Sequence, residues 1–172
     1  MNPIIKKFSI RAAILLAGWI ILYFLIIIPD GRINNFLTER VIDGTVIGLN
    51  SLGYDSKGEN AIVYIDDQAS VLVADGCNGL ELFALYIGFL IAFPGRVLYK
   101  ALFIPIGAVL IFVVNVLREI ALALNYKFFP DSFELNHKYT YVLIVYTFIF
   151  LIWRYWLNRY SLIANNQQQN EA

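Results

Sequence analysis

The sequence predicts an all-α integral membrane protein with four transmembrane helices. Hydrophobic residues make up 59% of the 172 residues, which is typical of a multi-pass membrane protein and too high for a soluble domain. The apolar residues gather in runs of the length that a bilayer requires. Basic residues recur at alternate connections between these runs, so that the positive-inside rule favours one orientation. We expect residues 1–172 to form a single membrane domain.

The first predicted membrane helix covers residues 12–28. Lys6, Lys7 and Arg11 precede this run, as they would in a signal peptide. The run is long, no small-residue cleavage site follows it, and further apolar runs come later, so we interpret it as an uncleaved anchor.

Residues 29–75 form an acidic, polar loop between the first two membrane helices. Its first part, residues 33–52, has apolar positions at mixed spacing, and we expect a short helix lying on the membrane there. Two β-branched runs within residues 61–74 flank Asp66-Asp67, which predicts a β hairpin that leads directly into the second membrane helix.

The other membrane helices are predicted over residues 76–93, 101–124 and 138–157. Pro94-Gly95 ends the second helix, and a polar loop at residues 125–136 separates the third from the fourth. The tail, residues 158–172, is rich in Asn and Gln, and we expect it to be disordered.

The basic residues predict the orientation. They lie before the first helix, between the second and third, and at the end of the fourth, at Lys6, Lys7, Arg11, Arg96, Lys100, Arg154 and Arg159. Both termini are therefore expected to be cytoplasmic, with the hairpin outside. This predicts a multi-pass protein of the cytoplasmic (inner) membrane whose active site faces the extracytoplasmic, periplasmic side.

Three chemically distinctive residues from three predicted helices fall in the same outer leaflet: Cys77, Arg118 and His137. A cysteine attacks as thiolate, and a nearby cation lowers the thiol pKa and stabilises an oxyanion. Histidine can take and return a proton near neutral pH. This combination favours thiol acyl transfer. With one cysteine and one histidine in the chain, we expect no internal disulfide, metal or cofactor.

Neighbouring residues extend this hypothesis. Asn115 lies one turn before Arg118 and could orient the guanidinium or donate to the oxyanion. We also expect two helix faces to pack together. The face on the second helix holds Cys77, Glu81, Ala84 and Gly88, and the face on the third holds Asn115, Arg118 and Glu119.

Each candidate also has a simpler interpretation. A lone cysteine in a membrane helix can be an apolar filler, and a histidine at a helix start can be an interfacial residue. A charged Arg118 in hydrocarbon must be functional or paired. The structural alternative for Arg118 is an ion pair with Glu119 or Glu81.

Several of these motifs resemble the exosortase/archaeosortase family of membrane transpeptidases. They are Gly76-Cys77-Asn78-Gly79 after a short hairpin, Asn115-x-x-Arg118 in the next helix, and His137 opening the last one. The small size and the Cys-Asn-Gly form are most similar to the short exosortase F type. The resemblance covers about residues 60–157 and implies a catalytic set of Cys77, Arg118 and His137. We place Asn115, Asn78 and Glu81 beside it as supporting residues, although many members have a neutral or basic residue near the position of Glu81.

The resemblance implies a membrane-embedded cysteine transpeptidase or peptidase. It would cleave C-terminal sorting signals of secreted proteins at the outer membrane face and transfer the proteins from a thioester on Cys77 to a cell-surface acceptor. The expected partners are substrates ending in a motif, a transmembrane helix and a basic cluster, the acceptor, and membrane lipid, but no nucleic acid. The alternative is a non-catalytic membrane subunit of a secretion or polysaccharide-export system. A small transporter is disfavoured, since its ionisable groups would lie near the bilayer midplane.

Overall fold

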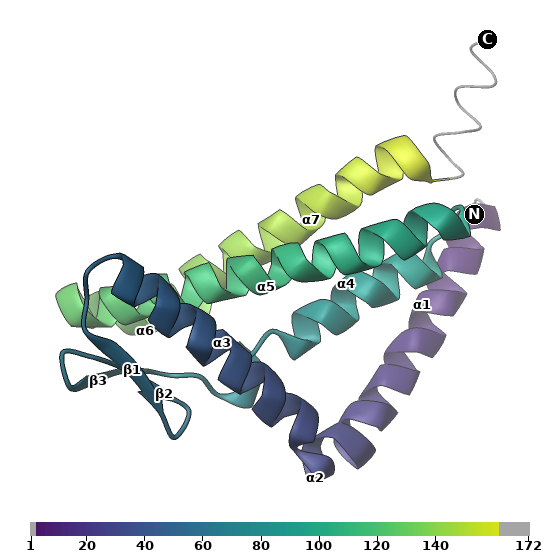
Figure 1. Cartoon of the computed structure of the whole chain (residues 1–172). Coiled ribbons are helices and arrows are strands. Elements are labelled where there is room, and N and C mark those ends of the chain that lie inside the picture. The colour runs from purple at the N-terminus through teal and green to yellow at the C-terminus, as the bar shows by residue number, and fades with distance from the viewer. Residues whose placement is uncertain (1–2, 162–172) are drawn as a thin grey trace.

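The structure is a computed structural model that describes residues 3–161, with side chains from residue 5 onward. Most of the described chain is helical (Figure 1). The elements are, in order, α1 (Pro3–Leu22), the π-helical turn η1 (Tyr23–Ile27), α2 (Ile28–Asp30), α3 (Arg32–Ser51), β1 (Ser56–Glu59), β2 (Ile62–Ile65), β3 (Gln68–Leu72), the 3-10 turn η2 (Asp75–Cys77), α4 (Leu80–Ala92), α5 (Val97–Phe128), the 3-10 turn η3 (Pro130–Ser132), α6 (Phe133–Leu135), the π-helical turn η4 (Asn136–Thr140) and α7 (Tyr141–Tyr160).

Three helical segments of the described chain are long and apolar enough to cross a bilayer: Ile5–Asp30, Val97–Phe128 and Pro130–Tyr160. They contain the first, third and fourth predicted membrane helices. The second is shorter than predicted, because the backbone turns through η2 and Gly79 and α4 begins only at Leu80. The 13 residues of α4 extend about 20 Å. The chain is thus a multi-pass membrane protein, whereas the four-span topology stays a prediction.

The polar segment between the first two apolar helices contains more regular structure than the sequence indicates. The helix expected within residues 33–52 is present, and it is longer than expected, because α3 covers all 20 residues of Arg32–Ser51. The predicted hairpin is present as β2 and β3, and β1 extends it to a three-stranded antiparallel sheet in the order β1-β2-β3. The additional strand, Ser56–Glu59, pairs with Ile62–Ile65. Lys127 at the end of α5 also pairs with Asp66 in the turn between β2 and β3, which ties the sheet to α5.

Helix α3 packs closely on α5 through two glycines. A Cβ at Gly48 would lie 2.3 Å from Cδ1 of Ile120, and a Cβ at Gly44 would lie 3.0 Å from a methyl carbon of Val116. The buried residues of α3 are Asn34, Thr38, Val41, Ile42, Thr45 and Leu49, so this helix presents polar as well as apolar side chains to the interior.

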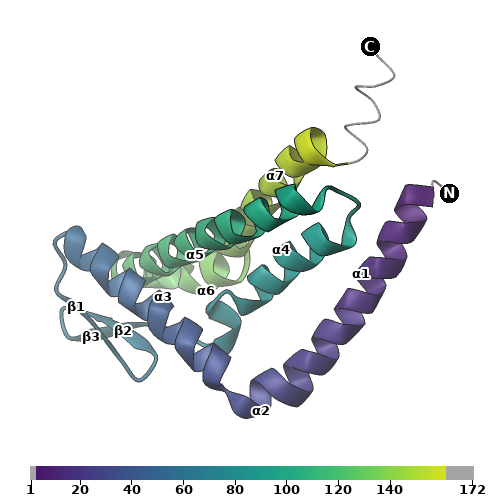
Figure 2. The same cartoon turned by 45° about the vertical axis from the view of Figure 1, so that its right-hand side comes forward.

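The two ends of the molecule differ in what they carry. The sheet and α6 lie at one end, while the N-terminus, the turn from α4 to α5 and the end of α7 lie toward the other (Figures 1 and 2). At the second end, Phe8 packs on Phe93 with ring centroids 5.3 Å apart, and Gly95 forms a β-bridge with Ser161. Helix α7 continues to Tyr160, so the first part of the predicted disordered tail is helical. Residues 162–172 of that tail lie outside the described residues.

Helices α4, α5 and α7 pack through an apolar cluster, which we define as Leu82, Tyr86, Leu90, Ile111, Val145, Ile149 and Trp156. Tyr86 packs against Gly107, where a Cβ would lie 2.1 Å from the tyrosine hydroxyl oxygen. That hydroxyl donates a hydrogen bond to the carbonyl of Phe103 at 2.8 Å. The apolar cluster therefore fixes the approach of α4 to α5.

The predicted packing of the Glu81 face against α5 is wrong. Glu81, Ala84 and Gly88 instead line a groove between α1, α4 and α7. Cys77 lies in the turn η2, before α4 begins at Leu80. Helical spacing therefore does not place Cys77 on the same face as Glu81, Ala84 and Gly88.

Candidate active site

Cys77 ends the 3-10 turn η2 and is half-buried. Its N–H donates to the carbonyl of Ala74 at 2.7 Å. The chain then passes through Gly79, whose φ of 87° lies in the left-handed region that favours glycine. A Cβ at Gly79 would also lie 3.3 Å from Nδ2 of Asn115. The glycine thus allows both the turn after Cys77 and the close approach of α5.

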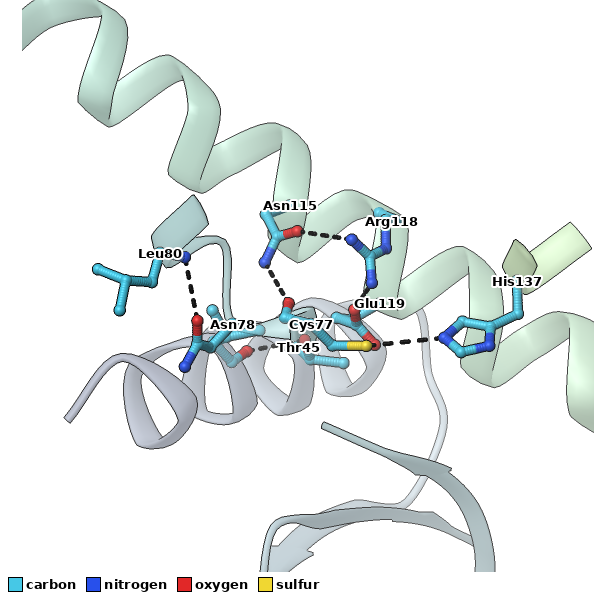
Figure 3. A network of polar contacts seen from close by, with 9 residues as sticks. Thr45, Cys77, Asn78, Leu80, Asn115, Arg118, Glu119 and His137 are labelled. Carbon is cyan, nitrogen blue, oxygen red and sulfur yellow. Dashed lines mark hydrogen bonds and ion pairs between the residues drawn. The ribbon is translucent and has the colours of Figure 1, made fainter. Parts of the chain in front are cut away.

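His137 lies in the π-helical turn η4 and points its ring at Cys77 (Figure 3). Its Nε2 is 3.6 Å from the Cys77 Sγ. The ring stacks on Phe133 with centroids 5.6 Å apart and an interplanar angle of 14°. π-Helical turns within helices occur frequently at functional sites, and here the turn brings the one histidine of the chain to its one cysteine.

A polar network fixes the segment that carries His137. Asn136 Nδ2 donates to Oδ1 of Asn125 at 3.3 Å, and Nδ2 of Asn125 donates to the Ser132 hydroxyl at 2.9 Å. Asn125 lies near the end of α5 and is buried. The network therefore ties both ends of the short α6 to α5.

Asn115 joins the backbone of Cys77 to the side chain of Arg118. Its Nδ2 donates to the carbonyl of Cys77 at 2.8 Å, and its Oδ1 accepts from Nη1 of Arg118 at 3.2 Å. Of the two roles expected for Asn115, orienting the guanidinium agrees with this geometry.

Arg118 also pairs with Glu119. Its Nη2 lies 3.0 Å from Oε1 of Glu119, with side-chain exposures of 9% for the arginine and 0% for the glutamate. Within the described residues, neither carboxylate oxygen of Glu119 has a hydrogen-bond partner. The ion pair considered as the structural alternative for Arg118 is therefore present, and it lies inside the group of residues around Cys77. We call Cys77, Asn115, Arg118, Glu119 and His137 the Cys77 cluster.

The environment of Cys77 raises the pKa of its thiol above the ordinary value. Burial is the largest cause and the charge of Glu119 the second, while the charge of Arg118 lowers the pKa. Arg118 acts on the thiol pKa in the direction expected from the sequence, and burial and the charge of Glu119 act against it.

The other two supporting candidates lie differently. The Asn78 side chain is buried and faces α3, where its Nδ2 donates to Oδ1 of Asn34 at 3.1 Å, and its Oδ1 accepts from the N–H of Leu80 at 3.0 Å. It thus anchors the turn after Cys77 to α3 and to the start of α4. Glu81 is exposed and lines the groove beside α1, apart from the Cys77 cluster.

Helix α3 contributes polar contacts that the sequence did not predict. Thr38 and Asn34 accept from Asn78, and the buried Thr45 donates its hydroxyl hydrogen to the carbonyl of Val41 at 2.8 Å. Two patterns indicate this packing: polar residues at helical spacing, and Gly44-x-x-x-Gly48, a small-residue spacing that lets helices approach.

No group of three or more His, Cys, Asp or Glu side chains is placed to hold a metal ion in the part of the chain that the structure describes. The Cys77 cluster instead offers the thiol of Cys77 as a potential nucleophile, the imidazole ring of His137, and the ion pair of Arg118 and Glu119.

Comparison with known proteins identifies the family. The family model described as transmembrane exosortase (Exosortase_EpsH) matches residues 9–154. No curated protein and no solved structure matches the chain. The matched region includes all of the Cys77 cluster and most of the three apolar segments. The family indicates in general terms a cysteine transpeptidase that sorts proteins at a membrane, and this chain belongs to the transmembrane exosortase family.

Proposed function

We propose that this protein is a cysteine transpeptidase or peptidase that removes the C-terminal sorting signal of secreted proteins at the outer face of the cytoplasmic membrane. The observation that carries the proposal is the 3.6 Å separation of Cys77 Sγ and His137 Nε2 beside the buried Arg118. The two residues are 60 positions apart in the chain and come from different elements, so their meeting is a property of the fold.

The first half-reaction forms a thioester. The Cys77 Sγ attacks the carbonyl carbon of the scissile peptide bond while His137 Nε2 takes the thiol proton. The guanidinium of Arg118 stabilises the oxyanion of the tetrahedral intermediate. When the C–N bond breaks, the leaving amine receives the proton from His137 and departs with the C-terminal signal.

The second half-reaction releases the protein. An acceptor nucleophile, an amine or water, attacks the thioester carbonyl and gives its proton to His137. The C–S bond breaks, and the Cys77 sulfur regains a proton from His137. An amine acceptor gives transfer to a cell-surface molecule, whereas water gives simple hydrolysis. Asn115 holds Arg118 and the Cys77 carbonyl in a fixed relation throughout.

The proposed substrates are secreted proteins whose C-terminus carries a recognition motif, a transmembrane helix and a basic cluster. Such a substrate lies in the same bilayer as the enzyme and presents the peptide before its helix at the extracytoplasmic side, where we place Cys77. The proposed environment includes membrane lipid and a surface acceptor, and no nucleic acid.

The test is to express wild type, Cys77→Ala and Cys77→Ser with a candidate substrate and to measure the C-terminal mass of that substrate by mass spectrometry. We expect wild type to remove the C-terminal helix and both variants to leave it attached. His137→Gln should reduce processing strongly, and Lys138→Gln, which changes the exposed neighbour of His137, should not. Equal processing in wild type and Cys77→Ala would refute the proposal, while a new mass on the product would identify the acceptor.

The buried ion pair of Arg118 and Glu119 favours one alternative, a non-catalytic membrane subunit of a secretion or polysaccharide-export system. In that case the pair serves stability alone. Cys77→Ala would leave secretion or export intact, and Arg118→Ala would lower the amount of folded protein.

A further inference from the structure

Glu119 is a buried carboxylate that the proposed reaction does not use. Its side chain is fully buried, and its Oε1 forms an ion pair with Nη2 of Arg118 at 3.0 Å. Neither oxygen has a hydrogen-bond partner among the described residues. An apolar or neutral side chain would fill the same space without the cost of burying a charge, so a carboxylate at this position requires an explanation beyond packing.

The position of Glu119 relative to Cys77 explains why a carboxylate is buried there. Figure 3 shows Arg118 and Glu119 beside the Cys77 side chain, and both act electrostatically on the thiol. The other titratable groups near the thiol are His137 of η4, Tyr141 at the start of α7, which packs on the same core, and Asp75 in its own turn. The charged residues of α3 are Arg32, Glu39, Arg40 and Asp43, and all of them are exposed. Glu119 is therefore the one fully buried carboxyl group at this site among the described residues.

We infer that Glu119 is a positioning residue that holds the Arg118 guanidinium toward Cys77 and opposes its charge, so that the thiol keeps its proton until His137 removes it during the reaction. The inference rests on the proposed role of Cys77 as nucleophile. A thiol that carries its proton at rest resists oxidation and alkylation, since these reactions require the thiolate. Arg118 then stabilises the oxyanion in the reaction without exposing a permanent thiolate beforehand.

The single cysteine makes the test site-specific. The rate of alkylation of Cys77 by iodoacetamide is measured against pH in the full-length protein in detergent, with mass spectrometry to confirm the modified residue. Glu119→Gln keeps the shape of the side chain but removes the charge. We expect its alkylation midpoint to fall by about one pH unit relative to wild type. Glu119→Asp keeps the charge and should restore the wild-type midpoint. Glu39→Gln, an exposed carboxylate on α3, should leave the midpoint unchanged.

A second pair of variants tests the same inference if Glu119→Gln does not fold. Arg118→Gln should raise the midpoint, since the thiolate loses its cation. The double variant R118Q/E119Q leaves no unpaired buried charge, and its midpoint should lie below that of Arg118→Gln. The inference would be overturned if Glu119→Gln left the alkylation midpoint unchanged or raised it. Equal midpoints in Arg118→Gln and the double variant would overturn it as well.

The result is separable from that of the processing test. Alkylation of Cys77 requires no substrate protein, so a shifted midpoint together with unchanged processing in Cys77→Ala would retain the role of Glu119 on the thiol and reject the sorting reaction. If processing depends on Cys77 but the alkylation midpoint is the same in wild type and Glu119→Gln, the sorting reaction is retained and the role of Glu119 is rejected.

Discussion

The apolar cluster and the Cys77 cluster both lie against α5, but different forces hold them together. In the apolar cluster, Tyr86, Ile111 and Trp156 are fully buried. Their contacts are van der Waals packing, in which Tyr86 fills the space that Gly107 leaves without a side chain. In the Cys77 cluster, Asn115 and Glu119 are equally buried, yet the contacts are hydrogen bonds and an ion pair. Packing tolerates small changes of volume, whereas a buried polar group that loses its partner bears the full desolvation cost. The two regions should therefore respond to mutation in different ways.

The largest effect is expected at the ion pair. Arg118→Leu leaves the Glu119 carboxylate buried and unpaired, which should cost about 3 to 5 kcal/mol of stability. The double variant R118L/E119L removes both charges and should recover most of this loss. Unfolding of detergent-solubilised protein, followed by temperature or denaturant, measures both.

The exposed pair of Arg40 with Asp43 provides the matched control. Arg40→Leu should change stability by less than about 1 kcal/mol. If Arg118→Leu were as mild as Arg40→Leu, the Cys77 cluster would not depend on its ion pair and the contrast between the two regions would fail.

A smaller effect is expected in the apolar cluster. Gly107→Val places methyl groups against the Tyr86 ring and should cost about 1 to 3 kcal/mol through overpacking. Gly18→Val is the control, since a Cβ at Gly18 meets no atom within 4 Å. The pH dependence of Cys77 alkylation should be the same in Gly107→Val as in wild type. A shifted alkylation profile would show that the two regions are coupled rather than independent.

The smallest effect on stability is expected at Asn125, outside both clusters. Asn125→Ala removes its hydrogen bonds to Ser132 and Asn136 and should cost about 1 kcal/mol. Because this network fixes the segment that carries His137, processing of a substrate should slow by more than the loss of stability explains. Asn35→Ala, at an exposed position on α3, serves as the control. Unchanged processing in Asn125→Ala would mean that stacking on Phe133 alone positions His137.

The difference between the clusters also explains how much could be predicted from the sequence. Long apolar runs correctly predict α1, α5 and α7, because hydropathy reports directly on burial in a bilayer. The grouping of Cys77, Arg118 and His137 follows from the order of the motifs and from placing all three at one end of the helices. Their meeting in the structure agrees with this prediction, and their catalytic roles stay predictions.

The rest depends on backbone geometry that hydropathy does not report. Gly79 in the left-handed conformation delays the start of α4 to Leu80, and this shift moves Glu81 away from α5. The polar face of α3 is equally hidden, because Asn34 and Thr38 resemble surface residues until Asn78 is known to reach them. The effect of Glu119 on the thiol depends on which face of α5 is turned toward Cys77. The sequence does not give that orientation, and the packed structure does.

The short length of α4 has a consequence for the depth of the thiol. A hydrocarbon core is about 30 Å thick, and the 13 residues of α4 extend about 20 Å. If the Phe93 end of α4 lies at the inner boundary of the hydrocarbon, Leu80 at its other end lies about 10 Å below the outer boundary, and Cys77 comes three residues before Leu80. A peptide would then have to be drawn beneath the headgroups to be cut, and bilayer thickness would help to determine how fast the reaction runs.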